Sequence, residues 1–402
     1  MNLQKPDRTA LVARRVLVTV AIAVVCLIAL SPPAAAHSAG GGTDATNFQT
    51  RFRALNPTVP GLDIEVIENG SRVQLTNTTG EEVVVLGYQE EPYLRVGPDG
   101  LFENRRSPAT YLNQDRQATT PVPGSADPKA DPKWEKISDG QVARWHDHRV
   151  HWMGEQDPPA VRRAPDRRHV VIPDWVIPIR MGDTTIQATG DLVWVPGPSP
   201  WPWVALAVGL FAATVVLAGS PAPRRALAAV VAVLVGIDMA HALGVGFAGP
   251  GSVGTQIGEA LAGSYLSVVG WVAGVVGVVL LVRRRIDGLY LAAFAGGLIA
   301  LNGGVADLAD LSRSQLLFAG PPNVARAAVA VSLGLGGGMV AAAVLCALRG
   351  SSRPDVADAA SGEVPAAKHH HAEWLFVLNH KGGFLRRRRR RRRRAHRAGQ
   401  AV

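Results

Sequence analysis

Cysteine is almost absent from this chain of 402 residues, which contains only Cys26 and Cys346. Both lie in apolar stretches, so the polar segment at residues 37–200 has no thiol and can form no disulfide bond. Thiolate coordination of a metal ion is excluded there for the same reason. A metal bound by this segment would need nitrogen, oxygen or thioether ligands, and its only methionines are Met153 and Met181.

The chain also has none of the short motifs that identify common enzyme classes. It contains no Gly-x-Ser-x-Gly nucleophile elbow, no glycine-rich phosphate-binding loop and no His-Glu-x-x-His pair. The pairs and groups of acids at Glu90-Glu91 and at Asp63, Glu65 and Glu68 are expected to be solvated. We therefore predict that the protein is not an enzyme.

The first 36 residues have the pattern of a secretory signal peptide. A basic start is followed by an apolar stretch from Val16 to Leu30 and by three small residues, Ala34 to Ala36, that suit cleavage. The apolar stretch is short for a spanning helix, although an uncleaved anchor is the alternative. In either case the following residues are expected outside the cytoplasm.

Long apolar runs begin at Trp201. Each is close to the ~20 residues needed to cross a bilayer, and they lie at about 203–219, 226–247, 263–282, 288–306 and 325–348. The chain is thus expected to have four parts: a signal peptide (1–36), an extracytoplasmic β-rich domain (37–200), a five-helix transmembrane domain (201–348) and a disordered basic tail (349–402).

Arginine residues indicate the orientation of these spans. Arg224-Arg225, Arg283 to Arg285 and the tail fall on one side of the membrane, whereas the loops on the other side carry only Arg313. The positive-inside rule makes the arginine-rich side cytoplasmic. Five crossings also take an outside start to an inside end. We therefore predict a multi-pass cell-membrane protein with an extracytoplasmic N-terminal domain and a cytoplasmic tail.

The formal net charge of +10 is concentrated in that tail, which holds His369 to His371 and the run Arg386 to Arg394. Arginines beside a bilayer attract anionic headgroups, so membrane lipids are the expected partners. Nucleic acid is not expected as a partner of a membrane-bound chain.

The extracytoplasmic segment resembles a series of short strands. Turn signals such as Gly97-Pro98-Asp99-Gly100 separate runs of β-branched or alternating apolar residues. The expected strands are 62–67, 72–76, 82–88, 93–96, 142–152, 168–172, 175–180 and 184–195. Together with the apolar runs, they predict the fold class: an extracytoplasmic all-β, sandwich-like domain followed by an α-helical bundle of about five transmembrane helices.

The densest chemistry in the chain is the segment Arg144 to Met153, which contains His146, His148 and His151. Imidazole is the commonest metal ligand among side chains, and its combination with a thioether suits copper. If 142–152 is a strand, His146 and His148 share one face and His151 lies on the other. Copper is the expected metal and zinc the alternative. The competing interpretation is that these histidines hydrogen-bond the backbone or nearby acids.

His37 is a second candidate ligand. Cleavage after Ala36 would make it the mature N-terminus, where its α-amine and imidazole could chelate Cu(II) together. A cut elsewhere would remove this possibility.

Ionisable residues also occur inside the apolar runs. Asp238 and His241 lie three residues apart and share a helix face, and Asn302, Asp307 and Asp310 lie near the outer end of the fourth run. Charged groups at membrane depth are costly and indicate a functional site by default. The alternative is a polar clamp between helices.

The stretches Tyr93 to Val96, Ser107 to Asn113, Arg144 to Arg149 and Trp194 to Trp201 resemble a family of uncharacterised actinobacterial membrane proteins. That resemblance covers most of the outer domain and implies no activity. A weaker resemblance, at the level of architecture, is to the CopC and CopD copper proteins, which combine a β-sandwich starting with His and a helical membrane part containing His. His37 and His241 match those two features, but the methionine-rich loop of many such sandwiches is missing.

These observations favour a membrane-anchored metal-handling protein. Its outer domain would bind copper, or zinc, through His146 and His148 with His37 or His151, and the membrane part would receive the ion at His241 and Asp238. The alternative is a non-enzymatic envelope scaffold that docks another envelope protein. A third option is a membrane protein that moves protons or a solute by means of Asp238 and His241, although no inverted repeat is evident.

Overall fold

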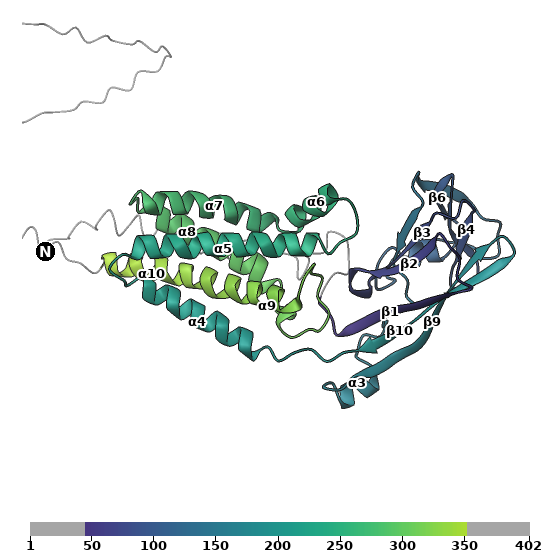
Figure 1. Cartoon of the computed structure of the whole chain (residues 1–402), viewed down its shortest axis with the longest axis horizontal. Helices are drawn as coiled ribbons and strands as arrows, with labels where there is room; N and C mark the ends of the chain where they lie inside the picture. The colour runs from purple at the N-terminus through teal and green to yellow at the C-terminus, as the bar shows by residue number, and fades with distance from the viewer. Residues whose placement is uncertain (1–44, 352–402) are drawn as a thin grey trace, which may run out of the picture. The chain divides into compact units, whose positions relative to one another are not determined.

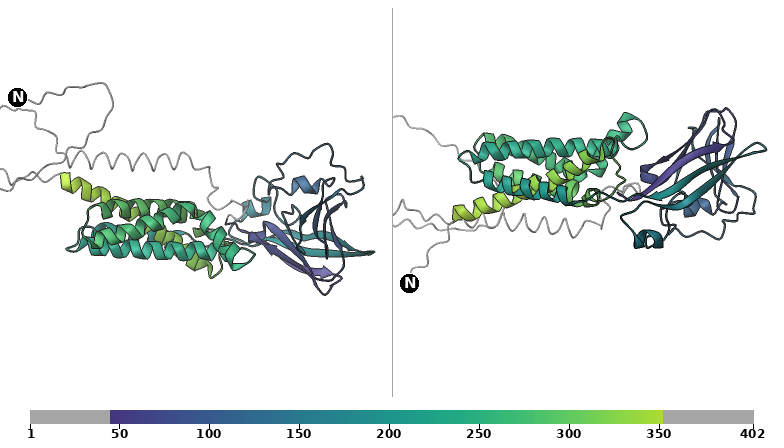
Figure 2. Two further views of the ribbon diagram at one scale, coloured as in Figure 1. Left: turned by 90° about the horizontal axis from the view of Figure 1, so that it is seen from above. Right: turned by 60° about the horizontal axis from the view of Figure 1, so that its bottom comes forward.

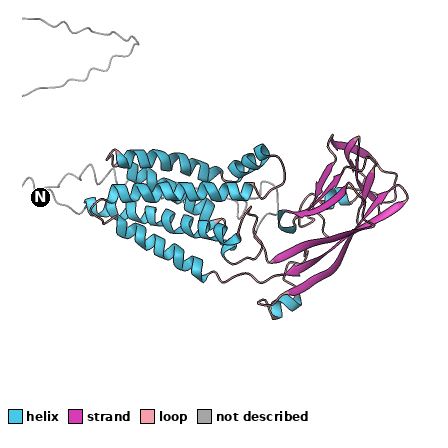
Figure 3. Ribbon diagram, in the orientation of Figure 1, coloured by secondary structure: helices cyan, strands magenta, loops and turns pink. Residues whose placement is uncertain are grey.

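The computed structural model describes residues 45–351 of the chain. The predicted signal peptide, His37 and the basic tail from residue 352 onward lie outside the described residues. Figure 3 shows two kinds of structure in the described part, a region of strands and a region of long helices, and the strands come first along the chain. An antiparallel β-sheet domain followed by membrane-type helices is thus confirmed.

In the described part of the N-terminal domain there are ten strands: β1 (Phe48–Asn56), β2 (Leu62–Ile67), β3 (Arg72–Asn77), β4 (Val83–Leu86), β5 (Pro92–Gly97), β6 (Gly100–Asn104), β7 (Trp134–Ser138), β8 (Val142–Trp145), β9 (His169–Met181) and β10 (Thr184–Trp194). Three short helical turns, η1 (Glu68–Gly70), α2 (Ala109–Leu112) and α3 (Pro159–Arg163), lie between them. The longest hairpin, β9–β10, turns at Gly182, whose φ of 54° is readily adopted by glycine.

The strands form two antiparallel sheets. The larger has the order β1-β10-β9-β4-β5-β6-β7 and the smaller the order β2-β3-β8. In the smaller sheet, Ile64 pairs with Leu75, and Leu75 in turn with Ala143, so that apolar side chains of neighbouring strands lie on one face. β8 ends at Trp145, whereas the sequence predicted a strand through residue 152.

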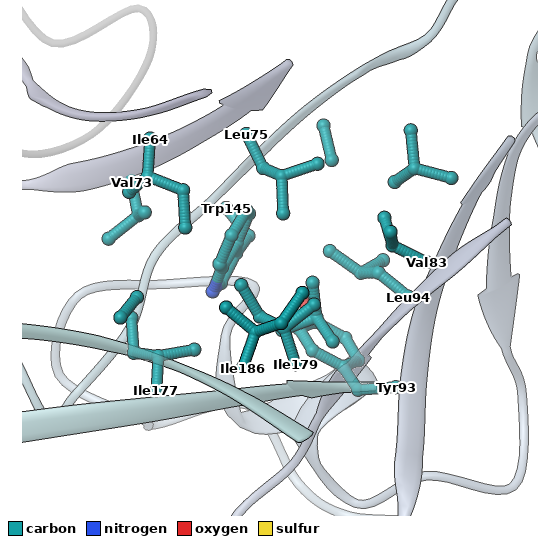
Figure 4. Packing of buried hydrophobic residues seen from close by; sticks show 14 of the residues in the cluster. Ile64, Val73, Leu75, Val83, Tyr93, Leu94, Trp145, Ile177, Ile179 and Ile186 are labelled. Carbon is teal, nitrogen blue, oxygen red and sulfur yellow. The ribbon is translucent and has the colours of Figure 1, made fainter. Parts of the chain in front are cut away.

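The two sheets contribute to one hydrophobic core. Leu75 and Trp145 of the smaller sheet lie among the buried isoleucines Ile177, Ile179 and Ile186 of the larger one (Figure 4). The indole of Trp145 is 4 % exposed, and the three isoleucines are fully buried. The segment that carries the histidine cluster therefore begins at a residue fixed in the core.

Within the described residues, seven helices follow: α4 (Trp201–Leu217), α5 (Pro223–Gly246), α6 (Val253–Gly263), α7 (Tyr265–Val282), α8 (Asp287–Ala300), α9 (Pro322–Val331) and α10 (Gly337–Ser351) (Figures 1 and 2). α8 continues into a π-helical turn, η2 (Leu301–Val305), and α9 is joined to α10 by a second one, η4 (Ser332–Gly336). A short 3₁₀ turn, η3 (Leu308–Leu311), follows η2.

Four of these helical stretches are long and apolar enough to cross a membrane: Pro223–Gly246, Tyr265–Val282, Asp287–Val305 and Pro322–Leu348. They correspond to four of the five predicted spans. The predicted first span, 203–219, corresponds to α4, a shorter apolar helix of 17 residues. At 1.5 Å per residue it extends ~26 Å, slightly less than the ~30 Å hydrocarbon core of a bilayer.

Glycines allow close contact between the long helices. A Cβ atom on Gly336 would lie 2.4 Å from the carbonyl oxygen of Gly296, and one on Gly334 would lie 2.5 Å from that of Ala207. The main chain of one helix thus packs directly against that of its neighbour. Gly334 and Gly338, four residues apart, both contact α4 in this way.

Candidate functional site

The histidine segment leaves the sheet after Trp145 and forms a turn. Asp147 accepts a backbone hydrogen bond from Val150 at 3.2 Å, so the chain bends instead of extending. Strand alternation does not apply here, and the predicted pairing of His146 with His148 on one strand face is wrong. The reason is the side chain of Asp147, which organises the turn from within.

Asp147 is fully buried and forms an ion pair with Arg149. Its Oδ1 accepts hydrogen bonds from the backbone N–H and the Nε of Arg149, at 3.1 and 2.8 Å, and its Oδ2 accepts from Nη2 of Arg149 at 2.7 Å and from the indole of Trp145 at 2.9 Å. Despite burial, Arg149 and these hydrogen bonds hold the pKa of Asp147 below its usual value. Every lone pair needed for metal binding is already used by a donor.

His146 is also fully engaged. Its Nδ1 lies 2.8 Å from the carbonyl oxygen of Ser71, and its Nε2 accepts a 3.4 Å hydrogen bond from Nε of Arg72. Burial lowers the pKa of His146, which favours the neutral ring. Both nitrogens of this predicted ligand therefore have protein partners, and the competing interpretation, backbone hydrogen bonding, describes it better.

His148 and His151 lie together on the other side of the turn. Their ring centroids are 5.4 Å apart with planes at 84°. The Nε2 of His148 lies 3.1 Å from the carbonyl oxygen of Asp115, and the Nε2 of His151 lies 3.1 Å from that of Arg116. The structure thus brings together a pair of histidines that the strand prediction had placed apart.

The loop that supplies these two carbonyls is held by the carboxylate of Asp115. It accepts hydrogen bonds from the backbone N–H groups of Gln117, Thr119 and Thr120 and from the hydroxyls of both threonines. These donors keep the pKa of Asp115 well below its usual value.

Burial also corrects the prediction for the acidic residues. Glu91 is 2 % exposed, and its carboxylate accepts hydrogen bonds from Ser107 Oγ at 2.7 Å and from the backbone N–H of Gln89 at 2.8 Å. Glu68 is partly buried, and desolvation raises its pKa. Neither side chain is a fully solvated acid.

No group of three or more His, Cys, Asp or Glu side chains suited to a metal ion occurs within residues 45–351. The predicted set that joins His146 and His148 to further ligands is therefore not assembled in that part of the chain. The pair His148 and His151 is what the outer domain offers, and His37 lies outside the described residues.

A second cluster lies inside the helical bundle, around Asp238 of α5. Its Oδ2 accepts a 2.7 Å hydrogen bond from the indole Nε1 of Trp271 on α7. Its Oδ1 lies 3.4 Å from the hydroxyl of Ser332 in the π-helical turn η4, and Ser267 of α7 also hydrogen-bonds the carboxyl group. Asp238 is 2 % exposed, so the helices enclose it almost completely.

The other π-helical turn closes the remaining side of this cluster. Gly303 of η2 packs against the carboxyl group, since a Cβ there would lie 2.0 Å from Oδ1 of Asp238. The neighbouring Asn302 donates a 3.2 Å hydrogen bond from Nδ2 to Ser267, while its buried Oδ1 has no hydrogen-bond partner among the described residues. π-Helical turns interrupt the regular helix and are frequent at functional sites.

His241 extends the cluster toward the end of α5. Its Nδ1 is 3.8 Å from Oδ2 of Asp307, and its ring stacks on Phe318 at 5.8 Å between centroids. Of the three predicted neighbours, Asn302 and Asp307 join Asp238 and His241. Asp310 instead lies in the turn η3, where its carbonyl oxygen accepts a 3.0 Å hydrogen bond from Nε of Arg326.

Three members of this cluster are not predicted by any sequence pattern: Trp271, Ser267 and Ser332. Each looks like an ordinary residue of an apolar run, because the pattern of one helix does not show which residue of another helix faces it. Arg326, which is 5 % exposed, was missed for the same reason. It also donates hydrogen bonds to the carbonyl oxygen of Arg313 and to Oδ1 of Asn323, at 2.7 and 2.9 Å, and so fixes the loop beside the cluster.

Comparison with protein-family models, with curated proteins and with solved structures finds no match to this chain.

Proposed function

We propose that this is a multi-pass membrane protein whose helical bundle binds and releases a proton at Asp238. The observation that carries the proposal is the enclosure of this carboxyl group by Trp271, Ser332, Ser267 and Gly303. A carboxyl group at membrane depth is costly to keep and indicates proton or ion handling by default. The third hypothesis from the sequence, proton or solute movement, thereby replaces metal transfer as the favoured role of this cluster.

The hydrogen bonds favour a proton over a metal ion. Both oxygens of Asp238 face N–H or O–H donors, and the positive ends of these dipoles disfavour a cation at the same oxygens. A hydroxyl such as that of Ser332 can reverse its role, donating to the carboxylate and accepting from the carboxylic acid. The surrounding groups can therefore follow a change in protonation without leaving a buried group unsatisfied.

In the same proposal, His241 and Asp307 relay the proton between Asp238 and the outer end of α5. They lie beside Asp238 on the side where α5 ends, and imidazole and carboxylate are the groups that relay protons within membranes. Asp238 itself lies eight residues before the end of α5 at Gly246, ~12 Å along the helix axis.

The topology completes the proposal. We take α4 as a fifth span, tilted little because it is short, and the two sheets as a sandwich-like domain. The arginine-rich loop Arg283 to Arg285 and the tail are assigned to the cytoplasm, which puts the β domain and His241 toward the outer side. Proteolysis of sealed vesicles of known orientation checks this assignment.

Infrared difference spectroscopy tests the proton site directly. Full-length protein in lipid is brought from high to low pH, and the C=O stretch of protonated carboxyl groups is recorded. We expect a band that is lost in Asp238→Asn and shifted in Trp271→Phe, since the second change removes the indole donor. Asp287→Asn is the control, because this side chain is 65 % exposed at the start of α8.

Identical difference spectra for wild type and Asp238→Asn would contradict the proposal. If the band is present, a pH-sensitive dye inside liposomes distinguishes proton transport from pH sensing. Proton flux that stops in Asp238→Asn identifies transport, and a carboxyl group that titrates without flux identifies sensing. Metal binding by the outer domain would be a separate property, independent of this cluster.

A further inference from the structure

His148 and His151 are oriented in the way that metal-binding imidazoles usually are. Each ring directs one nitrogen, Nε2, at a backbone carbonyl oxygen 3.1 Å away, and the two carbonyls belong to the consecutive residues Asp115 and Arg116. Metal ligands almost always donate the second ring N–H to a carbonyl, a carboxylate or water. The arrangement is therefore that of two ligands already held by their outer partners.

This contact determines which nitrogen carries the hydrogen. A carbonyl oxygen can only accept, so Nε2 must be the protonated nitrogen of each neutral ring, and Nδ1 keeps its lone pair. The Nδ1 of His151 is buried and has no hydrogen-bond partner within the described residues. A buried acceptor without a donor is costly, and a bound cation would satisfy it.

The distance between the two rings also fits a shared metal ion. A late first-row ion sits ~2 Å from each imidazole nitrogen, so one ion can reach two rings whose centroids are 5.4 Å apart.

We propose that His148 and His151 form a two-imidazole site, through Nδ1 of each ring, for a late first-row divalent metal ion, with Cu(II) bound most tightly. Copper is favoured because nitrogen ligands bind Cu(II) more strongly than the other divalent ions of the series. Water would occupy the other positions. His146 is not a ligand, since both of its nitrogens already have protein partners.

Titration of the purified full-length protein with Cu(II) tests the site, with electron paramagnetic resonance to count coupled imidazole nitrogens. Histidines outside the described residues contribute background binding, so the difference between variants is the measured quantity. The wild type should bind one Cu(II) more than the double variant His148→Gln with His151→Gln, and this extra ion should show two nitrogens. His148→Gln alone, at the less buried ring, should weaken that ion at least 10-fold while leaving the fold intact.

His169→Gln is the matched control. Its Nε2 also lies near a backbone carbonyl, that of Ala164 at 2.7 Å, but it belongs to β9 and not to the pair. Equal Cu(II) binding by wild type and the His148/His151 double variant would overturn the proposal, as would an equal loss in His169→Gln. Preference of the pair for Zn(II) over Cu(II) would overturn the copper assignment. Asp238→Asn should bind Cu(II) normally, which separates this site from the proton site.

Discussion

Removing the charge of Asp147 should destabilise the outer domain more than any other conservative substitution in the histidine segment. In Asp147→Asn the amide Nδ2 must face either the indole N–H of Trp145 or the guanidinium of Arg149, and both are donors. Arg149, 19 % exposed, then keeps a charge with no anionic partner. Breaking a buried ion pair in this way costs about 3–5 kcal/mol. We expect about 3 kcal/mol, since Arg149 still has the carbonyl oxygen of Leu86 and the face of Tyr88.

Hydrogen exchange of the full-length protein measures this effect locally, through peptides that cover residues 142–152. A matched control is Asp191→Asn. Asp191 also binds an arginine in a bidentate manner, at 2.7 and 2.6 Å, but its partner Arg51 is 43 % exposed. An ion pair whose arginine is open to solvent contributes little to stability, so this substitution should cost far less.

A double-mutant cycle with Arg149→Met completes the test. Because the cost in Asp147→Asn arises mainly from the stranded guanidinium, the double variant should be more stable than the two single effects together imply. If Asp147→Asn costs less than about 1 kcal/mol, or if the two substitutions are additive within about 0.5 kcal/mol, the turn is not held by this ion pair.

Three further predictions concern pH, helix packing and the core. Burial lowers the pKa of His146 and of His151, to about 4 for His151, so as the pH falls these histidines are protonated first in the unfolded chain. With a chelator present, the free energy of unfolding should therefore be constant above about pH 6.5 and fall as the pH drops toward 4, by up to about 3 kcal/mol for His151. A flat profile in denaturant titrations would contradict this prediction. Gly336→Ala should lower the thermal stability of the helical bundle by about 1–3 kcal/mol, because its methyl group would meet a carbonyl oxygen at 2.4 Å, whereas Gly236→Ala, with nothing within 4 Å, should not. Ile177→Ala, at a fully buried core position, should cost about 2–5 kcal/mol in equilibrium unfolding and leave the bundle unaffected.

Local patterns predicted much of the β domain. β2 and β3 agree with the expected runs within one residue, and the Gly97-Pro98-Asp99-Gly100 signal marks the β5–β6 hairpin. β1 was not predicted, because Arg51 and Arg53 interrupt its apolar residues; both arginines form ion pairs with acids on β9 and β10. Partners of that kind are distant in sequence, so no periodicity reveals them.

The candidate sites show the same limit. The spacing of Asp238 and His241 correctly indicated a shared polar region, because residues three apart on a helix lie on one face. Trp271 and Ser332 enclose Asp238 because of the way the helices pack, and this packing depends on close contacts at glycines. For the outer histidines the strand period was misleading, because the Asp147 turn replaces the strand after Trp145.

The loop at Asp115 has a consequence for how the two outer histidines behave. Their carbonyl partners are neighbouring residues of one chain segment, and a single carboxylate gathers the N–H groups of that segment. Both rings are therefore positioned by the same loop, so a change in the conformation of this loop moves both rings at once. Thr119 and Thr120 hydrogen-bond Asp115 and neither ring. Substitutions of these two threonines should therefore change the positions of both imidazoles together, and never of one alone.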